Sequence, residues 1–397
     1  MGKENILIVH NFYQIPGGED SVVENEKNLL VEKGHNVFLY TRHNNDLKNK
    51  GIFGKLLLPL ETIFSIKTYF EIKKIIRNKK IDIVHVHNTL PLISPSVYYA
   101  ARHSNATVVQ TIHNFRLMCP AATLVRNNSI CEACITKGLY SAVKYNCYRN
   151  SRIQSLISAL SLGFHRFIGT YKKVDGYITL TEFNRKMLER VIPKEKIYVK
   201  PNFVKNKYIK SNKSSNYFLF LGRLDELKGV KLLVEAWKTI KNTKLLIVGD
   251  GPLEKELNDI IKNYNLSNIE LLGFKKKDEV MELIDNSKAL VVPSQWYEGF
   301  PMTIAESFSL GTPVIAGDIG NLPTIVEDYK NGLIFKYNDI NDLRNKINTL
   351  NENSELLEEL SMGAKDSYNQ KYNYDKNYKQ LLRIYNTCKR GHLSNVL

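Results

Sequence analysis

Two glutamates in a short glycine-bearing segment are the first candidates for chemistry. Glu298 and Glu306 bound the run Glu-Gly-Phe-Pro-Met-Thr-Ile-Ala-Glu. The apolar residues 289–292 before it suit a buried parallel strand, and the residues after Gly299 suit a helix, whose first N–H groups could bind a phosphate or sugar oxygen. The pair alone leaves an alternative open, in which Glu298 favours a helix N-terminus and Glu306 is a solvated helix residue.

Two cations follow another predicted strand, which ends at Leu221. Arg223 and Lys228 are bracketed by Gly222 and Gly229. An arginine can make a forked contact with a diphosphate, a lysine adds a point charge, and glycines let the backbone approach a ligand closely. An isolated pair of cations can equally be a solvated one.

The first half of the chain also has candidate ligand-binding residues at strand ends. His113 directly follows a predicted strand that ends at Ile112, and Gly17 and Gly18 lie between the first strand and a helix that starts near Ser21. Ligands bind outside the carboxyl ends of strands in open α/β sheets. The structural alternatives are a histidine without a ligand and an ordinary strand-to-helix turn.

The elements that must position these residues alternate in type. With 397 residues, the chain exceeds what one hydrophobic core usually supports, and each half alternates short apolar strands with helical stretches. The predicted strands are 6–9, 37–40, 83–86, 108–112, 176–180, 217–221, 245–248, 269–272, 289–292 and 313–316. We therefore predict an α/β fold with two doubly wound Rossmann-like domains facing a cleft, over residues 1–205 and 206–373. The polar stretch 206–216 would be the linker, and residues 374–397 would form a helix that returns to pack on the N-terminal domain.

Taken in order, the motifs resemble the retaining glycosyltransferases of family 4, which have the two-domain GT-B fold. The segment from His113 to Pro120, with the cysteines that follow it, also resembles a subgroup of bacterial capsule and polysaccharide glycosyltransferases. The motifs that carry the resemblance are Gly17-Gly18, His113, Gly222-Arg223, Lys228-Gly229, Val248 to Pro252, the pair Glu298 and Glu306, and Gly311 to Val314. The resemblance implies a hexosyltransferase with an acceptor-binding first domain and a donor-binding second domain.

The resemblance also implies roles for individual residues. Arg223 and Lys228 would hold the diphosphate of a UDP- or GDP-sugar, and Glu306 would bind its ribose. The residues expected to contact the donor sugar or to let the backbone approach the donor are Glu298, Gly299, Phe300, Gly222, Gly17 and Gly18, with His113 contacting the sugar from the first domain. Because two cations would stabilise the departing diphosphate, no catalytic metal is expected.

Four of the five cysteines cluster within 29 residues. Cys119, Cys131, Cys134 and Cys147 have the spacing C-x11-C-x2-C-x12-C, whose central C-x2-C suits a zinc knuckle. A structural zinc, cysteines without a ligand and a redox role all stay open. Structural disulfides are not expected in the reducing cytoplasm.

The positive charge is concentrated in one half of the chain. Residues 1–200 have 29 Lys and Arg against 15 Asp and Glu, a net +14 of the total +16. Within this half, segments 52–80 and 144–173 interleave apolar residues with cations, as interfacial helices on anionic membranes do, although these apolar residues could also face the core. The sequence has no signal-peptide core and no apolar run of roughly 18 residues. We expect a cytoplasmic protein, peripheral at the inner face of the plasma membrane, that acts on a lipid-diphosphate-linked glycan acceptor.

Two other functions fit parts of the pattern. A sugar-nucleotide 2-epimerase shares the two-domain architecture and would act on the donor without an acceptor. The basic half could instead mark a nucleic-acid-binding protein, but no recognition motif accompanies it, so nucleic acid is not expected as a partner.

Overall fold

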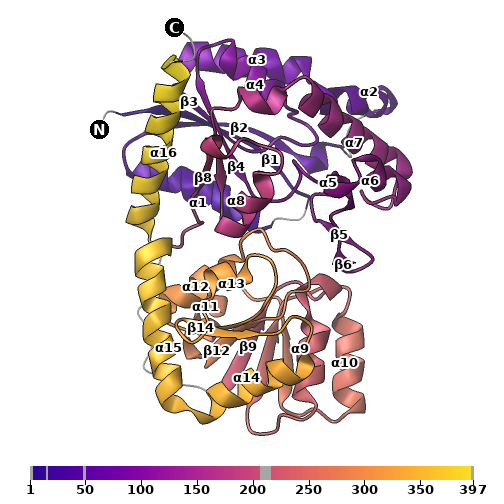
Figure 1. Ribbon diagram of the computed structural model, residues 1–397, viewed down its shortest axis with the longest axis vertical. Helices are drawn as coiled ribbons and strands as arrows, with labels where there is room; N and C mark the ends of the chain where they lie inside the picture. Colours follow the sequence, from indigo (N-terminus) through magenta and orange to yellow (C-terminus); the bar gives the residue numbers. More distant parts are fainter. Residues whose placement is uncertain (1–2, 15–16, 48–50, 206–215, 395–397) are drawn as a thin grey trace. The chain divides into compact units, whose positions relative to one another are not determined.

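The chain forms two α/β domains (Figure 1). The computed structural model describes residues 3–14, 17–47, 51–205 and 216–394, apart from the side chains of 52–56 and 392–394. The first domain comprises residues 1–123, 132–200 and 378–397, and the second comprises 124–131 and 201–377. Nearly all of the predicted linker, residues 206–215, lies outside the described residues.

The first domain is built on a parallel sheet with the strand order β2-β1-β3-β4-β7-β8. Its strands are β1 (Asn5–Phe12), β2 (Asn36–His43), β3 (Ile83–Asn88), β4 (Thr107–Ile112), β7 (Gly176–Thr179) and β8 (Ile197–Val199). Its helices are α1 (Gly18–Glu32), α2 (Ile52–Ile63), α3 (Ile66–Lys79), α4 (Ser96–Arg102), α5 (Ala133–Thr136), α6 (Tyr140–Lys144), α7 (Arg152–Phe167), α8 (Glu182–Leu188) and α16 (Tyr374–Ser394), the last continuing from the second domain.

The second domain repeats this plan with the strand order β11-β10-β9-β12-β13-β14, again parallel. Its strands are β9 (Tyr217–Leu221), β10 (Lys244–Val248), β11 (Ile269–Gly273), β12 (Ala289–Val292), β13 (Val314–Gly317) and β14 (Gly332–Phe335). Its helices are α9 (Val230–Trp237), α10 (Glu254–Asn263), α11 (Lys277–Asn286), α12 (Met302–Leu310), α13 (Leu322–Ile325), α14 (Ile340–Glu352) and α15 (Ser354–Ser367). The short hairpin of β5 (Val125–Arg126) and β6 (Ser129–Ile130) is grouped with this domain.

Both sheets have a point where the strand order reverses. In the first domain, β1 lies between β2 and β3, and in the second, β9 lies between β10 and β12. The loops that leave the two strands at such a point run to opposite faces of the sheet and open a crevice at their carboxyl ends. The loops after β1 and β9 carry the predicted glycine and cation motifs.

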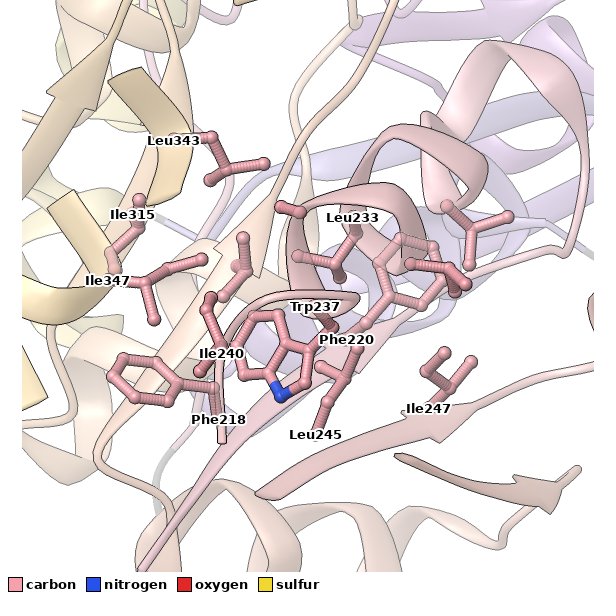
Figure 2. Close-up of a cluster of buried hydrophobic side chains, with 14 of the residues drawn as sticks. Phe218, Phe220, Leu233, Trp237, Ile240, Leu245, Ile247, Ile315, Leu343 and Ile347 are labelled. Atoms are coloured by element: carbon pink, nitrogen blue, oxygen red, sulfur yellow. The ribbon is translucent and has the colours of Figure 1, made fainter. Parts of the chain in front are cut away.

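Hydrophobic periodicity explains the core of the second domain (Figure 2). On α9, Val230, Leu233, Val234 and Trp237 recur at helical spacing and are fully buried. The Trp237 ring packs edge-on against Phe218 of β9, with 5.8 Å between ring centroids. The helices therefore pack on the sheet, and the candidate site residues lie in the loops at the carboxyl ends of its strands.

The tail helix α16 packs on the first domain. Leu381, Leu382 and Tyr385 are buried in a cluster with Ile6 and Ile8 of β1. Gln380 Nε2 donates to the Val199 carbonyl of β8, so polar contacts accompany the apolar ones.

Membrane-spanning helices are a separate question. Within the described ranges, no helix has both the length and the apolar character needed to cross a bilayer.

Candidate active site

Lys228 and Glu298 form the centre of the site in the second domain. Lys228 Nζ lies 2.8 Å from Glu298 Oε1, and the Ser294 hydroxyl donates to the same oxygen at 2.7 Å. Lys228 ends the 3₁₀ turn η4 (Glu226–Lys228), which follows β9, and its backbone N–H is bonded to the Asp225 carboxylate. Glu298 follows β12, the neighbour of β9 at the reversal point. The fold thus brings together two predicted site residues that are 70 positions apart.

The Glu298 carboxylate is ionised although it is buried. Only 5% of Glu298 is exposed, and burial alone would raise its pKa. The charge of Lys228, with hydrogen bonds from Lys228 and Ser294, outweighs burial and lowers the pKa below its ordinary value. Lys228 also lies 5.5 Å from the centroid of the Trp296 ring, a cation–π contact. The site therefore holds a fixed ion pair whose ammonium remains partly accessible.

Glycines allow the loops around this pair to touch. A Cβ on Gly249 would lie 1.9 Å from the Gly222 carbonyl oxygen, and one on Gly229 would lie 1.9 Å from the Pro293 carbonyl oxygen. Both glycines have positive φ, +137° and +72° respectively, which side chains disfavour. The glycine after β10 thus allows two loops of the site to pack against each other.

The segment from Gly299 to α12 presents backbone rather than side chains. Phe300 is buried against Tyr372, with 5.7 Å between ring centroids, and the Asn321 side-chain amide donates to the Gly299 carbonyl at 2.8 Å. Helix α12 begins at Met302 after Pro301, which gives no side-chain cap to its first N–H groups. The Ile304 N–H donates to the Pro301 carbonyl at 3.1 Å, and a helix start without a side-chain cap is a suitable place for an anion. No local sequence pattern indicates this contact of Asn321, which lies 22 positions from Gly299.

Glu306 and Arg223 lie in the same domain but outside the central pair. Glu306, on α12, is largely buried, and its Oε1 lies 3.4 Å from Lys277 Nζ. Arg223 is exposed, with Nε 3.7 Å from Asp225 Oδ2, so its guanidinium can turn toward a ligand. Gly222 places its backbone near the Lys228 stem, because a Cβ there would lie 3.9 Å from Lys228 Cδ.

His113 lines a pocket in the first domain, at the carboxyl ends of β3 and β4. Its neighbours in the pocket wall include His87, Asn114, Arg116 and, from α7, Ser158. Burial lowers the pKa of His113 to about 3, so the imidazole is neutral. His87 Nδ1 lies 2.9 Å from His113 Nε2.

Gly17 and Gly18 precede and begin α1, beside other polar groups. A Cβ on either glycine would meet nothing within 4 Å, so space is open in front of this helix end. The Glu19 carboxylate accepts from the Tyr13 hydroxyl at 2.9 Å, and burial raises the pKa of Glu19. Asn114 Nδ2 lies 3.5 Å from the same carboxylate oxygen. No local sequence pattern indicates these polar neighbours, because their proximity depends on contacts between distant loops.

The predicted zinc ligands divide between the domains. Cys119, Cys134 and Cys147 belong to the first domain, and Cys131 belongs to the segment grouped with the second. In the described part of the chain, the group with metal-ligand atoms within 4.8 Å of one another consists of Glu26, His85 and His87 instead. The cysteine site remains a prediction.

Two α/β domains, each built on a parallel sheet with a strand-order reversal, agree with the GT-B fold of glycosyltransferases. Residues 204–367 match the family model described as glycosyl transferases group 1, and residues 16–207 match the model described as glycosyltransferase family 4. The chain belongs to glycosyltransferase family 4.

Relatives and solved structures are similar over most of the chain. An uncharacterised glycosyltransferase of Methanocaldococcus jannaschii is 29% identical, over 96% of this chain and 97% of the relative. An uncharacterised 42.6 kDa protein in the cps region of Klebsiella pneumoniae is 25% identical, over 85% and 91%. The crystal structure of a glycosyltransferase from Rickettsia africae has a TM-score of 0.70 at 20% identity, over 98% and 99%. The Anabaena protein HepE in complex with UDP and glucose has a TM-score of 0.63 at 17% identity, over 95% and 98%. The two structures support the GT-B fold.

Proposed function

We propose that this glycosyltransferase moves a hexose from a UDP- or GDP-sugar, with retention, to a lipid-diphosphate-linked glycan acceptor in polysaccharide biosynthesis. The observation that carries the proposal is the Lys228–Glu298 ion pair at the strand-order reversal. A relative in a cps region and a structural neighbour in complex with UDP and glucose agree with it.

The charges of the second domain suit a diphosphate leaving group. Glu298 neutralises only part of the positive charge, because Arg223 is exposed and the first N–H groups of α12 have no side-chain cap. As the bond to the sugar breaks, negative charge grows on the diphosphate, and preorganised cations lower the barrier. The Lys228 ammonium would donate a hydrogen bond to an oxygen of the departing diphosphate, while Glu298 holds the ammonium in place. We therefore propose that these cations do the work that a catalytic metal does elsewhere.

Donor binding can be tested directly by thermal shift. Purified protein is screened against UDP, GDP, ADP and their sugars, with and without EDTA. A rise in melting temperature with one nucleotide that survives EDTA supports the metal-free diphosphate site and identifies the base. A rise that EDTA abolishes would contradict metal-independent binding of the diphosphate. No rise with any nucleotide would contradict the proposal that the donor is a nucleotide sugar. Product mass then separates transfer from epimerisation, because only transfer adds a sugar to an acceptor.

The acceptor part of the proposal is supported by helix α7. Ile153, Leu156, Leu160, Phe164 and Phe167 follow one another at helical spacing, and 43–91% of each is exposed. Exposed cations flank this stripe, with Arg149 and Arg152 before it and Lys172 after it. On the opposite side, Ser158, Ser161 and Leu162 line the His113 pocket. An apolar stripe with basic ends suits the surface of an anionic membrane, and insertion there would bring a lipid-linked acceptor to the pocket.

Vesicle sedimentation tests the membrane part. Wild-type protein should pellet with vesicles containing phosphatidylglycerol more than with phosphatidylcholine alone. Leu160→Ser with Phe164→Ser should weaken this binding, since each side chain loses on the order of 1 kcal/mol of apolar burial. Met362→Ser, at an exposed apolar position of the second domain, is the matched control. Equal sedimentation of both variants would remove α7 from the proposal.

A further inference from the structure

A buried group of charged and titratable side chains lies behind His113. Glu26 of α1 and Lys200 are each only 1% exposed, and Lys200 Nζ lies 3.3 Å from Glu26 Oε2. The other carboxylate oxygen, Glu26 Oε1, lies 2.8 Å from His85 Nδ1 and 4.0 Å from His87 Nε2. Burial of such groups opposes folding unless they compensate one another, and an apolar core of equal volume would serve stability as well. The cluster therefore calls for a function.

His87 connects this cluster to His113. The rings of His87 and His113 are stacked at an interplanar angle of 18°, and His87 Nδ1 lies 2.9 Å from His113 Nε2. On the far side, His87 Nε2 is a buried atom without a hydrogen-bond partner. It lies 4.0 Å from Glu26 Oε1, which also lies 2.8 Å from His85 Nδ1. The series Glu26, His87, His113 thus ends at the pocket wall.

The charge of Glu26 decides where the protons lie. The attraction of Lys200 and His85 overcomes burial and keeps the pKa of Glu26 well below its ordinary value, so it is a carboxylate. Burial lowers the pKa of His87 well below its ordinary value, so each imidazole in the series has one proton. The negative Glu26 oxygen favours that proton on Nε2 of His87. The Nδ1 of His87 then has a lone pair and accepts the Nε2–H of His113, which leaves Nδ1 of His113 unprotonated.

We propose that Glu26 and His87 are positioning residues that fix the tautomer of His113, so that its Nδ1 accepts a hydrogen bond from a hydroxyl of the sugar substrate. The part about the sugar rests on the proposed function, whereas the tautomer does not. An acceptor at this point favours a ligand that donates, and it disfavours a carbonyl or ether oxygen.

A metal ion is the competing interpretation of the same side chains. Glu26, His85 and His87 could supply three ligand atoms. Lys200 already neutralises the carboxylate and would repel a second cation, and the Tyr385 hydroxyl lies 2.7 Å from His85 Nδ1. These contacts favour the series Glu26, His87 and His113, which we call the tautomer relay, over a metal site.

Nitrogen-15 NMR of the full-length protein tests the tautomer without substrate. Two-bond nitrogen–proton correlations distinguish the two neutral forms of an imidazole, and His113→Asn assigns the His113 signals. We expect the Nε2–H form of His113 in the wild type. The Nδ1–H form would overturn the proposal. If the Nε2–H form is found but no sugar is transferred, the proposed function fails and the relay stands.

Matched variants test the positioning role. His87→Leu removes the acceptor for His113 Nε2–H, and we expect a mixture of His113 tautomers with a roughly tenfold lower kcat and little change in the KM for the donor. His87→Asn keeps an acceptor oxygen near the position of Nδ1 and should restore both readouts. The double variant Glu26→Gln with Lys200→Met removes both buried charges together and should also yield mixed tautomers. Unchanged tautomers in His87→Leu, or stoichiometric metal that is lost in the double variant, would overturn the relay.

Discussion

The behaviour of Lys228 depends on one neighbour, the carboxylate of Glu298 at 2.8 Å. A flexible lysine usually loses side-chain entropy when it is fixed, but here a buried carboxylate and the Trp296 ring hold it before any ligand arrives. Its remaining N–H donors can therefore meet a diphosphate without reorganisation. The same contact makes Glu298 dependent on Lys228, because a carboxylate left alone in this place would be buried and unpaired.

Replacing Lys228 by Ala should lower the transfer rate by roughly a hundredfold or more, as expected for loss of a preorganised cation at the developing charge. Glu298 should then lose the interaction that lowers its pKa, so the melting temperature should fall as well. Lys231→Ala is the matched control, since Lys231 is paired with Glu226 and Glu256 on the surface of the same region. Transfer by Lys228→Ala at a nearly normal rate would remove Lys228 from the mechanism.

Glu306→Gln should lower the affinity for the nucleotide by about tenfold if Glu306 binds the ribose diol, because a hydrogen bond to a charged group contributes about 1.5–3 kcal/mol. A 2′-deoxy nucleotide lacks one of the two hydroxyls and should be affected less by the same change. Comparison of both nucleotides by calorimetry separates ribose contact from a general effect on folding. Lys277→Ala, which removes the partner of Glu306, should leave this discrimination in place. Equal weakening of both nucleotides would contradict the role.

At the scale of elements, the loops after β9, β10 and β12 act as one unit. The backbone N–H of Leu224 donates to the Asp250 carbonyl at 2.7 Å, and the N–H of Gln295 donates to the Leu227 carbonyl at 2.8 Å. Glycines make these approaches possible. The position of Lys228 therefore depends on loops that contribute no side chain to the chemistry.

Gly249→Ala should destabilise the second domain by roughly 2–3 kcal/mol and weaken donor binding, because the φ of +137° suits glycine alone and the new Cβ would meet the Gly222 carbonyl. Denaturant unfolding and donor titration measure the two effects. Gly163→Ala in α7 is the control, since its Cβ would make an ordinary 3.5 Å contact with Leu139 and helix propensity favours alanine. If Gly249→Ala changed neither the free energy of unfolding nor donor affinity, the loops would tolerate being moved apart.

The segment that contains Cys119, Cys131, Cys134 and Cys147 has its own prediction. If it binds zinc, elemental analysis of protein purified without chelator should find about one zinc per chain. Cys131→Ser with Cys134→Ser should abolish that zinc, whereas Cys388→Ser, remote in sequence, should not. Absence of zinc from the wild type would contradict the metal and favour unliganded or redox-active thiols.

The predicted strands correspond closely to β1, β2, β3, β4 and β7 of the first sheet and to β9 through β13 of the second. Apolar runs of four or more residues made them recognisable. Strands β8 and β14 are not among the predicted strands, because β8 has only three residues and β14 begins with a glycine. Short edge strands have little periodicity of their own, and pairing with a neighbour determines them.

Candidate site residues can be predicted where a motif lies in a loop at a strand end, but the contacts that packing creates between distant residues cannot. Lys228 and Glu298 lie beside glycines at strand ends, which is a local signal. The contact between Glu26 and Lys200 spans 174 positions and places two charged residues in a core, which no local pattern indicates.

At the scale of the whole molecule, the two domains differ in their response to acid. All nine histidines belong to segments of the first domain, and both tryptophans, Trp237 and Trp296, belong to the second. Burial lowers the pKa of His35, His87, His113 and His165 from the ordinary 6.5. Such histidines favour the folded state when they are neutral.

The sign of the pH dependence follows from these directions. Below about pH 6.5 these histidines bind protons in the unfolded chain but stay neutral in the folded one, for His113 down to about pH 3. The stability that the neutral histidines contribute is therefore present above pH 6.5 and is lost as the pH falls. Each such histidine contributes a slope of up to about 1.4 kcal/mol per pH unit. Glu26, whose pKa is also lowered, adds to the loss below about 4.5. Glu19 has a raised pKa and opposes it, but one carboxyl does not offset four histidines.

Urea unfolding at pH 7.5 and pH 5.5 should therefore separate the domains. Tryptophan fluorescence reports only the second domain and its midpoint should change little, whereas circular dichroism should gain a component that unfolds at lower urea at pH 5.5. His87→Asn should reduce the difference in urea midpoint of this component between pH 7.5 and pH 5.5, since one buried neutral imidazole is removed. If the fluorescence midpoint falls together with the circular dichroism signal, the domains unfold as one cooperative unit, which would contradict a response to acid confined to the first domain.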